Sequence, residues 1–207
     1  MKSYTFRNQP LFLRNTFQGI GRWSLPIIRR QDIELVNLNL ISYNNTRYNE
    51  APMFRDFAVH FFVDDKRFEI VYEQPELSFE KLRQYKILLT PDFSLYGEMQ
   101  PWRRIENVGK SRWCGAFWQS KGAFVIPTIS WSTPESFDYA FDGIETGSCV
   151  AIGMIGCKHS KRNFLTGYHA MQERIKPQTI ICFGSPFQEM QQDNLIIIDY
   201  INTWRLR

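Results

Sequence analysis

Runs of consecutive apolar residues recur along the chain, and each run gives way to polar or glycine residues. Such runs, rich in Val, Ile and Phe, predict strands that are buried on both faces, as in a parallel sheet. The predicted strands cover residues 57–65, 86–96, 123–130, 148–156, 179–187 and 194–200. Two shorter strands are expected earlier, at residues 22–30 and 38–44, which gives about eight strands in all. Pro26 places the first of them at a sheet edge, because proline cannot donate a ladder hydrogen bond.

Segments with helical spacing separate most of the predicted strands. The expected helices cover residues 67–75, 78–85, 101–122, 134–143 and 160–175. Ser78 is expected to be the N-cap of its helix. Ser132 has capping-box spacing to Glu135 and is expected to cap the short helix that follows. Pro101 occupies a first-turn position, and Pro177 ends the last helix.

The alternation of strands and helices indicates βαβ units and a parallel sheet, which is an α/β fold. Our first prediction is a compact, barrel-like (β/α) fold with mostly parallel strands, and the alternative is an open doubly wound sheet. Two features count against a full barrel: the chain is short for one, and the first two strands have no convincing helix between them. We expect a single domain over residues 1–207, in which residues 1–55 form an irregular, Arg- and Asn-rich part with short strands.

The composition is that of a folded domain. Hydrophobic residues make up 43% of the 207-residue chain and aromatic residues 15%, which is enough for a core and excludes a disordered chain. The formal net charge of +4 is small, and the basic residues are scattered along the chain. This charge allows contact with nucleic acid but does not by itself indicate it.

Two absences bear on location. No stretch approaches the ~20 apolar residues of a membrane span, and the N-terminus lacks the apolar run of a signal peptide. The four cysteines form no Cys-x-x-Cys pair, which predicts reduced thiols and argues against a zinc site. We therefore expect a cytoplasmic protein with no membrane partner; the sequence indicates no oligomeric state.

Polar, ionisable or glycine residues follow five of the apolar strands. In parallel α/β folds, ligands bind beyond the carboxyl ends of the strands, so these residues are the candidates for a site. In chain order the five strand exits supply Asp64, Asp65 and Arg67; Asp92, Ser94 and Tyr96; Ser130, Trp131 and Ser132; Gly156, Cys157, Lys158 and His159; and Gly184, Ser185 and Pro186.

Three carboxylates in this set are the candidate catalytic residues. Asp64, Asp65 and Asp92 would supply acid–base chemistry or hold a divalent metal ion. Each also has a structural interpretation, which stays open. Asp64 and Asp65 would pair with Arg67 or cap the next helix, and Asp92, after Pro91, would bond its own backbone in a turn.

The candidate ligand-binding residues are of several kinds. Trp131 lies between two serines at a strand exit, where it would either stack on a planar ligand or pack in the core. Cys157 precedes a helix and adjoins a cation, which would lower its pKa, although no general base is evident. Lys158 and Lys161, with the helix N-terminus after them, would hold an anion such as phosphate. The full set is Arg67, Ser94, Tyr96, Ser130, Trp131, Ser132, Cys157 and Lys158.

No motif fixes the reaction. The chain has no Walker phosphate loop, no Gly-x-Gly-x-x-Gly after its first βα strand, no His-Glu-x-x-His and no Gly-x-Ser-x-Gly. A two-carboxylate glycosidase that uses Asp92 with Asp64 or Asp65 is geometrically possible, but nothing specific selects it.

Four runs carry a resemblance to a known family: VHFFVDDKRFE, LLTPDFSLY, PTISWSTPESFDYAFDG and CFGSPF. The sequence resembles a domain family of unknown function found in bacteria, phages and other mobile elements, from about residue 15 to residue 200. The resemblance implies a phage or mobile-element setting in a host cytoplasm. It implies no reaction, and its four runs coincide with the strand exits.

Three functions follow as hypotheses, of which the third is a degenerate barrel retained as a scaffold. The first is a small (β/α) enzyme that acts on a nucleotide, a modified base or a nucleic-acid end, with Trp131 stacking on a base and Lys158 meeting phosphate. The second is a non-enzymatic factor in replication or host takeover. It would contact DNA or a host protein through the Arg-rich N-terminal part and the C-terminal NTWRLR.

Overall fold

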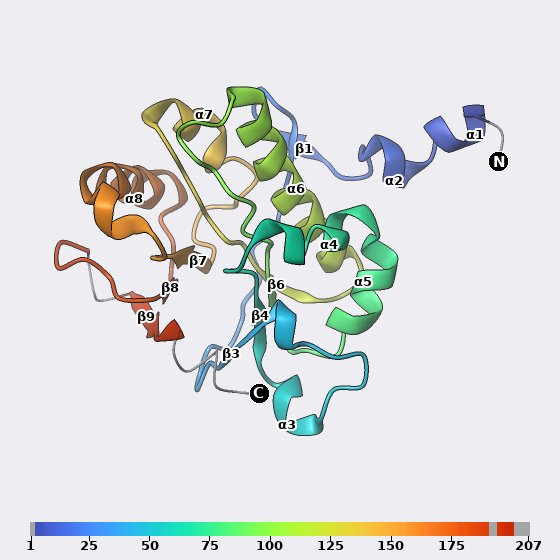
Figure 1. The fold of residues 1–207 in the computed structure, drawn as a ribbon, viewed down its shortest axis with the longest axis horizontal. Helices are drawn as coiled ribbons and strands as arrows, with labels where there is room; N and C mark the ends of the chain where they lie inside the picture. The colour runs from blue at the N-terminus through green and yellow to red at the C-terminus, as the bar shows by residue number, and fades with distance from the viewer. Residues whose placement is uncertain (1–2, 191–193, 201–207) are drawn as a thin grey trace.

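Seven parallel strands, in sequence order, form the centre of the protein (Figure 1). The computed structural model describes residues 3–190 and 194–200. The first sheet contains β3 (Leu40–Ser42), β4 (Ala58–His60), β5 (Ile87–Leu89) and β6 (Phe124–Ile126). The second contains β7 (Val150–Gly153), β8 (Ile180–Phe183) and β9 (Leu195–Ile198). A single parallel bridge between Thr128 and Ala151 joins the two sheets.

The strands curve around a shared apolar interior. Strands β4 and β8 are four places apart in the strand order, so in a flat sheet they would lie about 19 Å apart. Instead the rings of Phe62, just after β4, and Phe183, in β8, stack with their centroids 4.7 Å apart. One apolar cluster draws buried side chains from six of the strands: Leu40, Ala58, Ile87, Leu89, Ile126, Ala151, Ile181 and Phe183.

The predicted α/β fold with parallel strands is confirmed. The strand order follows the sequence and lacks the reversal that defines a doubly wound sheet. Closure into a full barrel is not seen, because β3 and β9 do not pair with each other in the described residues.

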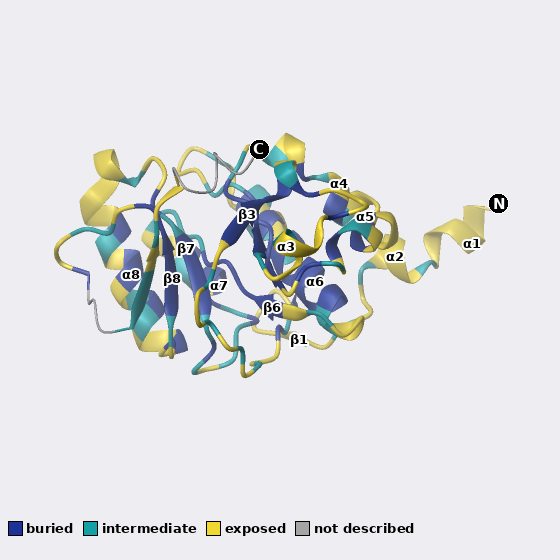
Figure 2. Ribbon diagram, turned by 90° about the horizontal axis from the view of Figure 1, so that it is seen from below, coloured by how far each residue is buried: buried dark blue, intermediate teal, exposed yellow. Residues whose placement is uncertain are grey.

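Helices cover the outer face of the strands. They are α4 (Ile70–Glu73), α5 (Pro75–Leu82), α6 (Pro101–Ser120), α7 (Phe137–Ala140) and α8 (Lys161–Ile175). Helix α6 packs Trp113 and Trp118 against the first sheet, and α8 packs Tyr168 and Met171 against the second. Figure 2 shows β3, β7 and β8 as buried, whereas β9 is only partly buried. None of the helices within residues 3–190 and 194–200 is long and apolar enough to cross a membrane.

The N-terminal part is irregular. Helices α1 (Ser3–Arg7) and α2 (Pro10–Leu13) are exposed and extend from the body (Figure 1). Strands β1 (Gly19–Ile20) and β2 (Leu25–Pro26) form an antiparallel pair, and α3 (Pro52–Arg55) precedes β4. Four 3-10 helices complete the structure: Tyr43–Asn45, Asp65–Arg67, Pro134–Ser136 and Cys157–Ser160.

The strand predicted at residues 22–30 is largely wrong. Only Leu25–Pro26 is a strand, and it pairs with β1 outside the parallel sheets. The left-handed residues Gly21 (φ 74°) and Ser24 (φ 49°) turn the chain back on itself here. The parallel sheets therefore hold seven strands rather than about eight.

Two predicted helix starts are also wrong. Helix α5 begins at Pro75, so Ser78 lies inside it and donates its hydroxyl to the Ile70 carbonyl at 3.1 Å. The predicted helix at residues 134–143 is a 3-10 turn followed by the four-residue α7, and Gly143 (φ 79°) lies beyond its end. The helices predicted at residues 101–122 and 160–175 are confirmed as α6 and α8.

Candidate functional site

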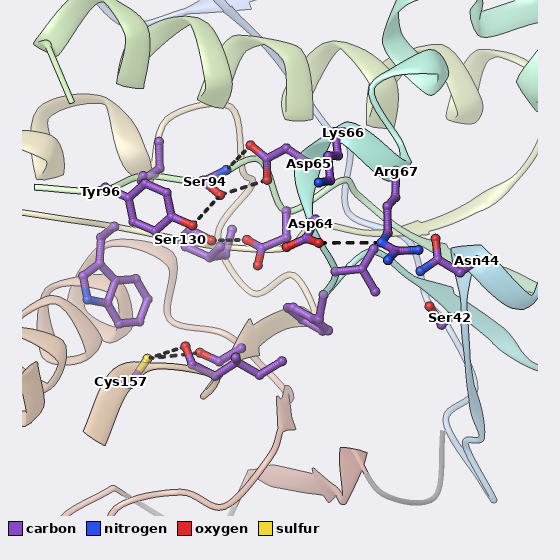
Figure 3. Close-up of a pocket in the computed structure, with 18 of the residues that line it drawn as sticks. Ser42, Asn44, Asp64, Asp65, Lys66, Arg67, Ser94, Tyr96, Ser130 and Cys157 are labelled. Carbon is purple, nitrogen blue, oxygen red and sulfur yellow. Dashed lines mark hydrogen bonds and ion pairs between the residues drawn. The ribbon is translucent and has the colours of Figure 1, made fainter. Parts of the chain in front are cut away.

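A cavity of about 960 Å³ opens at the carboxyl ends of the strands (Figure 3). This volume is typical of a site for a small organic ligand. Nine of the predicted site residues line it: Asp64, Asp65, Arg67, Asp92, Ser94, Tyr96, Ser130, Trp131 and Cys157. Ser132 and Lys158 are not among its lining residues. The fold therefore brings together side chains from four strand exits, as expected for parallel strands.

Asp92 is the most perturbed acid of the cavity. It follows β5, and its Oδ1 accepts a hydrogen bond from the Ser130 hydroxyl, which follows β6. Among the described residues, its Oδ2 has no hydrogen-bond partner. Burial raises the pKa of Asp92 to about 6, the Ser130 hydrogen bond lowers it in part, and the charge of Asp65 raises it further. The carboxyl can therefore be protonated or ionised near neutral pH.

Asp65 has a different environment. Its two carboxylate oxygens accept the Ser94 amide at 3.0 Å and the Ser94 hydroxyl at 2.8 Å. The Tyr96 hydroxyl lies 3.3 Å from Ser94 Oγ. Because Ser94 gives its only hydroxyl proton to Asp65, Tyr96 donates to Ser94. Asp65 therefore orders a chain of hydroxyls along the cavity wall.

Asp64 is exposed and forms an ion pair with Arg67 at 3.6 Å. It makes no side-chain cap to the 3-10 helix that follows, so of its two structural interpretations only the ion pair is observed. Asp92 bonds Ser130 rather than its own backbone, so its predicted turn role is wrong.

Two buried side chains of helix α6 donate hydrogen bonds to the loops that follow β5 and β6. Asn107, which is 3% exposed, donates to the Ser94 carbonyl at 2.7 Å. Arg104, which is 6% exposed, donates to Ser132 Oγ at 3.1 Å and Thr133 Oγ1 at 2.9 Å. The sequence reasoning missed both residues. Their signal was a series of polar residues at helical spacing on the buried side of α6, which continues with Lys110 and Ser111.

Ser132 has a structural position different from the one predicted. Thr133, not Ser132, precedes the 3-10 turn, and no side-chain cap forms there. The Ser132 amide instead donates to Ser136 Oγ at 3.0 Å, and its hydroxyl accepts from Arg104. The capping-box prediction is therefore wrong, because a buried arginine takes the hydroxyl.

Trp131 combines its two predicted environments. It lines the cavity and also packs against Phe164 of α8, with ring centroids 4.9 Å apart. The backbone of Gly167 approaches the indole so closely that a Cβ at this glycine would lie 2.2 Å from the ring. One part of the ring is therefore fixed by the helix while another part faces the cavity.

Cys157 and Lys158 differ from their predicted chemistry. The Cys157 thiol lies 3.6 Å from the Gly153 carbonyl oxygen, and burial, with the charge of Asp92, raises its pKa to about 11. The expected lowered pKa is therefore wrong. Lys158 is exposed and lies outside the cavity lining. Lys161 pairs with Glu189 at 2.6 Å.

Two buried polar residues lie on neighbouring strands, and of the two only the first lines the cavity. Ser42 and His60 are register partners on β3 and β4 and are 6% and 0% exposed. Ser42 lines the cavity, and its Oγ has no hydrogen-bond partner in the described part of the chain. The same holds for His60 Nε2. Ser42 was missed from sequence, because only strand register reveals its place.

No group of three or more His, Cys, Asp or Glu side chains within the described residues is arranged to hold a metal ion. A divalent ion at this site would therefore use Asp65 and Asp92 together with ligand or water oxygens. The four cysteines are free thiols in the structure.

Comparisons with known proteins add the family and its setting. The family described as domain of unknown function (DUF4417) matches residues 17–201. The chain is 40% identical over 177 residues to the Gene 1 protein of Mycobacterium phage L5, covering 84% of this chain and 76% of that protein. It is 39% identical over 177 residues to the Gene 1 protein of Mycobacterium phage D29, covering 84% and 65%. No solved structure matches.

Proposed function

The chain belongs to this family of unknown function, and we propose that it is a small enzyme that carries out acid–base chemistry on a nucleotide-sized ligand. The predicted resemblance to a phage family is confirmed, and both similar proteins are phage proteins whose names give no activity. Membership of the family therefore indicates a phage protein, and the proposed activity is inferred from the residues of the cavity. We also propose the host cytoplasm as its location.

The observation that carries the proposal is the state of Asp92. A carboxyl with a pKa of about 6 can donate a proton to one atom of a ligand and recover it within one turnover. Its unpartnered Oδ2 is the atom available for this exchange. Ser130 fixes the other oxygen, which restricts the orientation of the carboxyl.

The remaining lining residues support a nucleotide as the ligand class. Trp131 and Tyr96 offer aromatic surface on which a base would stack. Lys66 and Arg67 offer positive charge for phosphate, in place of Lys158, which lies outside the cavity. Asp65 would hold the Ser94 and Tyr96 hydroxyls at the cavity wall, with their oxygens as acceptors for a donor group of the ligand.

The experiment is a product assay. Nucleosides, nucleotides and short oligonucleotides would be incubated with the protein and the products followed by liquid chromatography and mass spectrometry. Asp92→Asn should reduce conversion by about 10²-fold or more. The control is Asp138→Asn, an exposed aspartate on α7, which should leave conversion unchanged. Equal conversion by wild type and Asp92→Asn would reject the proposal.

A divalent metal ion stays a prediction for this site. Titration with Mg²⁺ and Mn²⁺ in the same assay tests it. Metal-dependent conversion that is lost on chelation and in Asp65→Asn would support coordination by the two carboxylates.

The N-terminal segment favours a second candidate, a DNA- or host-protein-binding factor. Helices α1 and α2 contain no buried residue, and Tyr4, Phe6 and Phe12 are 75%, 50% and 52% exposed. Exposed aromatics beside Arg7 suit contact with a macromolecule. The C-terminal NTWRLR, which the same hypothesis invokes, lies outside the described residues. DNA affinity that falls steeply with salt and is lost on deletion of residues 1–13 would support this candidate.

A further inference from the structure

We propose that the end of the cavity formed by Ser42, Asn44 and Arg67 binds a phosphate group of the ligand. This inference rests on the proposed nucleotide ligand and assigns one part of it to one part of the site. Figure 3 shows Ser42, Asn44 and Arg67 at one end of the cavity, away from Tyr96 and Cys157.

The Ser42 hydroxyl, at this end of the cavity, is a polar group without a partner among the described residues. It is buried, it lines the cavity, and its oxygen has no hydrogen-bond partner in the described part of the chain. A buried hydroxyl without a partner is unfavourable, and native proteins satisfy such groups with water, an ion or a ligand. The Ser42 Oγ is itself covered by its neighbours, so a ligand oxygen reaches it only when adjacent side chains of the cavity wall shift.

His60, on the neighbouring strand, carries its proton on Nε2. Its Nδ1 accepts the Phe62 amide at 3.3 Å, and burial keeps the imidazole neutral by lowering its pKa to about 3. A neutral imidazole that accepts at one nitrogen carries its proton on the other. The unpartnered Nε2 is therefore a second buried donor, on the strand position that pairs with Ser42, although His60 itself does not line the cavity.

The positively charged side chains of the cavity lie next to each other in the chain. Lys66 and Arg67 are the two cationic residues that line the cavity within the described chain, and both follow β4. Arg67 has one exposed ion pair, with Asp64, and Asn44 adds an exposed amide. Ser42, Asn44 and Arg67 place hydrogen-bond donors at this end, where a phosphate would compete with the Asp64 carboxylate for Arg67.

Calorimetric titration with three probes tests the inference: nucleoside monophosphates, the matching nucleosides, and inorganic phosphate. The wild type should bind the monophosphates at least ten-fold more tightly than the nucleosides. Ser42→Ala should remove most of this difference and leave nucleoside affinity unchanged. Arg67→Gln should also weaken monophosphate binding.

Two matched controls separate ligand contact from folding. Ser78→Ala removes a buried serine hydroxyl that does have a partner, the Ile70 carbonyl. It should lower the melting temperature and leave monophosphate binding unchanged, whereas Ser42→Ala should leave the melting temperature unchanged or raised. Arg83→Gln removes an exposed i,i+3 ion pair with Glu80, as Arg67→Gln does with Asp64, and should not affect binding.

The outcomes distinguish this inference from the proposed function. Equal affinity for nucleosides and monophosphates, or a full phosphate contribution in Ser42→Ala, would overturn the phosphate subsite while the proposed enzyme stands. Binding of inorganic phosphate that depends on Ser42, with no nucleoside binding, would keep the subsite and overturn the nucleotide ligand. A fall in melting temperature for Ser42→Ala equal to that of Ser78→Ala, with binding intact, would make the Ser42 hydroxyl structural.

Discussion

Phe62 and Phe183 stack face to face across the interior, with ring centroids 4.7 Å apart and planes inclined by 12°. The contact joins the exit of β4 to β8, which are distant in the strand order, and Phe62 also lines the cavity. This stack therefore holds the strands in their curved arrangement and also fixes Phe62, one of the side chains that line the cavity. His60 packs on Phe183 as well, with ring centroids 4.6 Å apart.

Phe183→Ala should lower the free energy of unfolding by about 3–5 kcal/mol, because it leaves a cavity under two rings. Urea denaturation of wild type and variant measures the change. The control is Phe124→Ala, which removes a strand phenylalanine that is 48% exposed and should cost far less. Equal losses for the two variants would show that the interior stack does not stabilise the curved sheet.

Asp92→Asn should make the protein more stable at neutral pH. The folded pKa of Asp92 is about 6 against an ordinary value of 3.8, so the folded state holds the proton more tightly. Stability is therefore lost as pH rises from about 4 to about 6, by about 1–3 kcal/mol. Asparagine keeps an acceptor for Ser130 and removes the buried charge.

Thermal denaturation at pH 4 and pH 8 checks this prediction. The variant should melt above wild type at pH 8, and the gap should shrink at pH 4, where wild-type Asp92 is protonated. A variant that melts below wild type at pH 8 would mean that the ionised carboxylate stabilises the fold. Loss of activity combined with a gain in stability is the pattern expected of a strained functional group.

The strand exits were predictable because apolar runs and their polar ends are local features of the sequence. Asp65, Asp92 and Ser130 meet because parallel strands end at one edge, which is a general property of the fold. Their individual bonds were not predictable. The Ser130 hydroxyl donates to the Asp92 carboxyl only because β5 and β6 are neighbouring strands in register.

The features missed from sequence depend on contacts between distant residues. Arg104 overrides the capping box at Ser132 from a helix that precedes it by almost thirty residues in the chain. Contacts of this kind, between residues far apart in the chain, decide whether a serine such as Ser132 caps a helix, and local sequence propensity does not. Pro26 in the early strand did indicate an edge, but the adjacent tight turn decided that its partner is β1 rather than a parallel strand.

Cys157 should react slowly with iodoacetamide at pH 7, because burial raises the pKa of its thiol to about 11. Only the thiolate is nucleophilic, so the alkylation rate should rise about ten-fold per pH unit up to pH 10. Peptide mapping by mass spectrometry distinguishes it from Cys149, which is also partly buried. Rapid alkylation of Cys157 at pH 7 would restore the nucleophile hypothesis.

Gly167→Ala, a substitution on α8, should displace Trp131, which lines the cavity. A Cβ at this position would lie 2.2 Å from the Trp131 indole, so the ring must move, and α8 holds it against Phe164 on one side. Overpacking of this kind costs about 1–3 kcal/mol, and displacement of the ring toward the cavity would weaken binding of a stacked base. Thr166→Ala, an exposed change on the same helix, is the control and should affect neither property. Fluorescence of a bound nucleoside analogue, together with urea denaturation, measures both effects. If stability falls while nucleoside affinity is unchanged, Trp131 is a packing residue and does not contact the base.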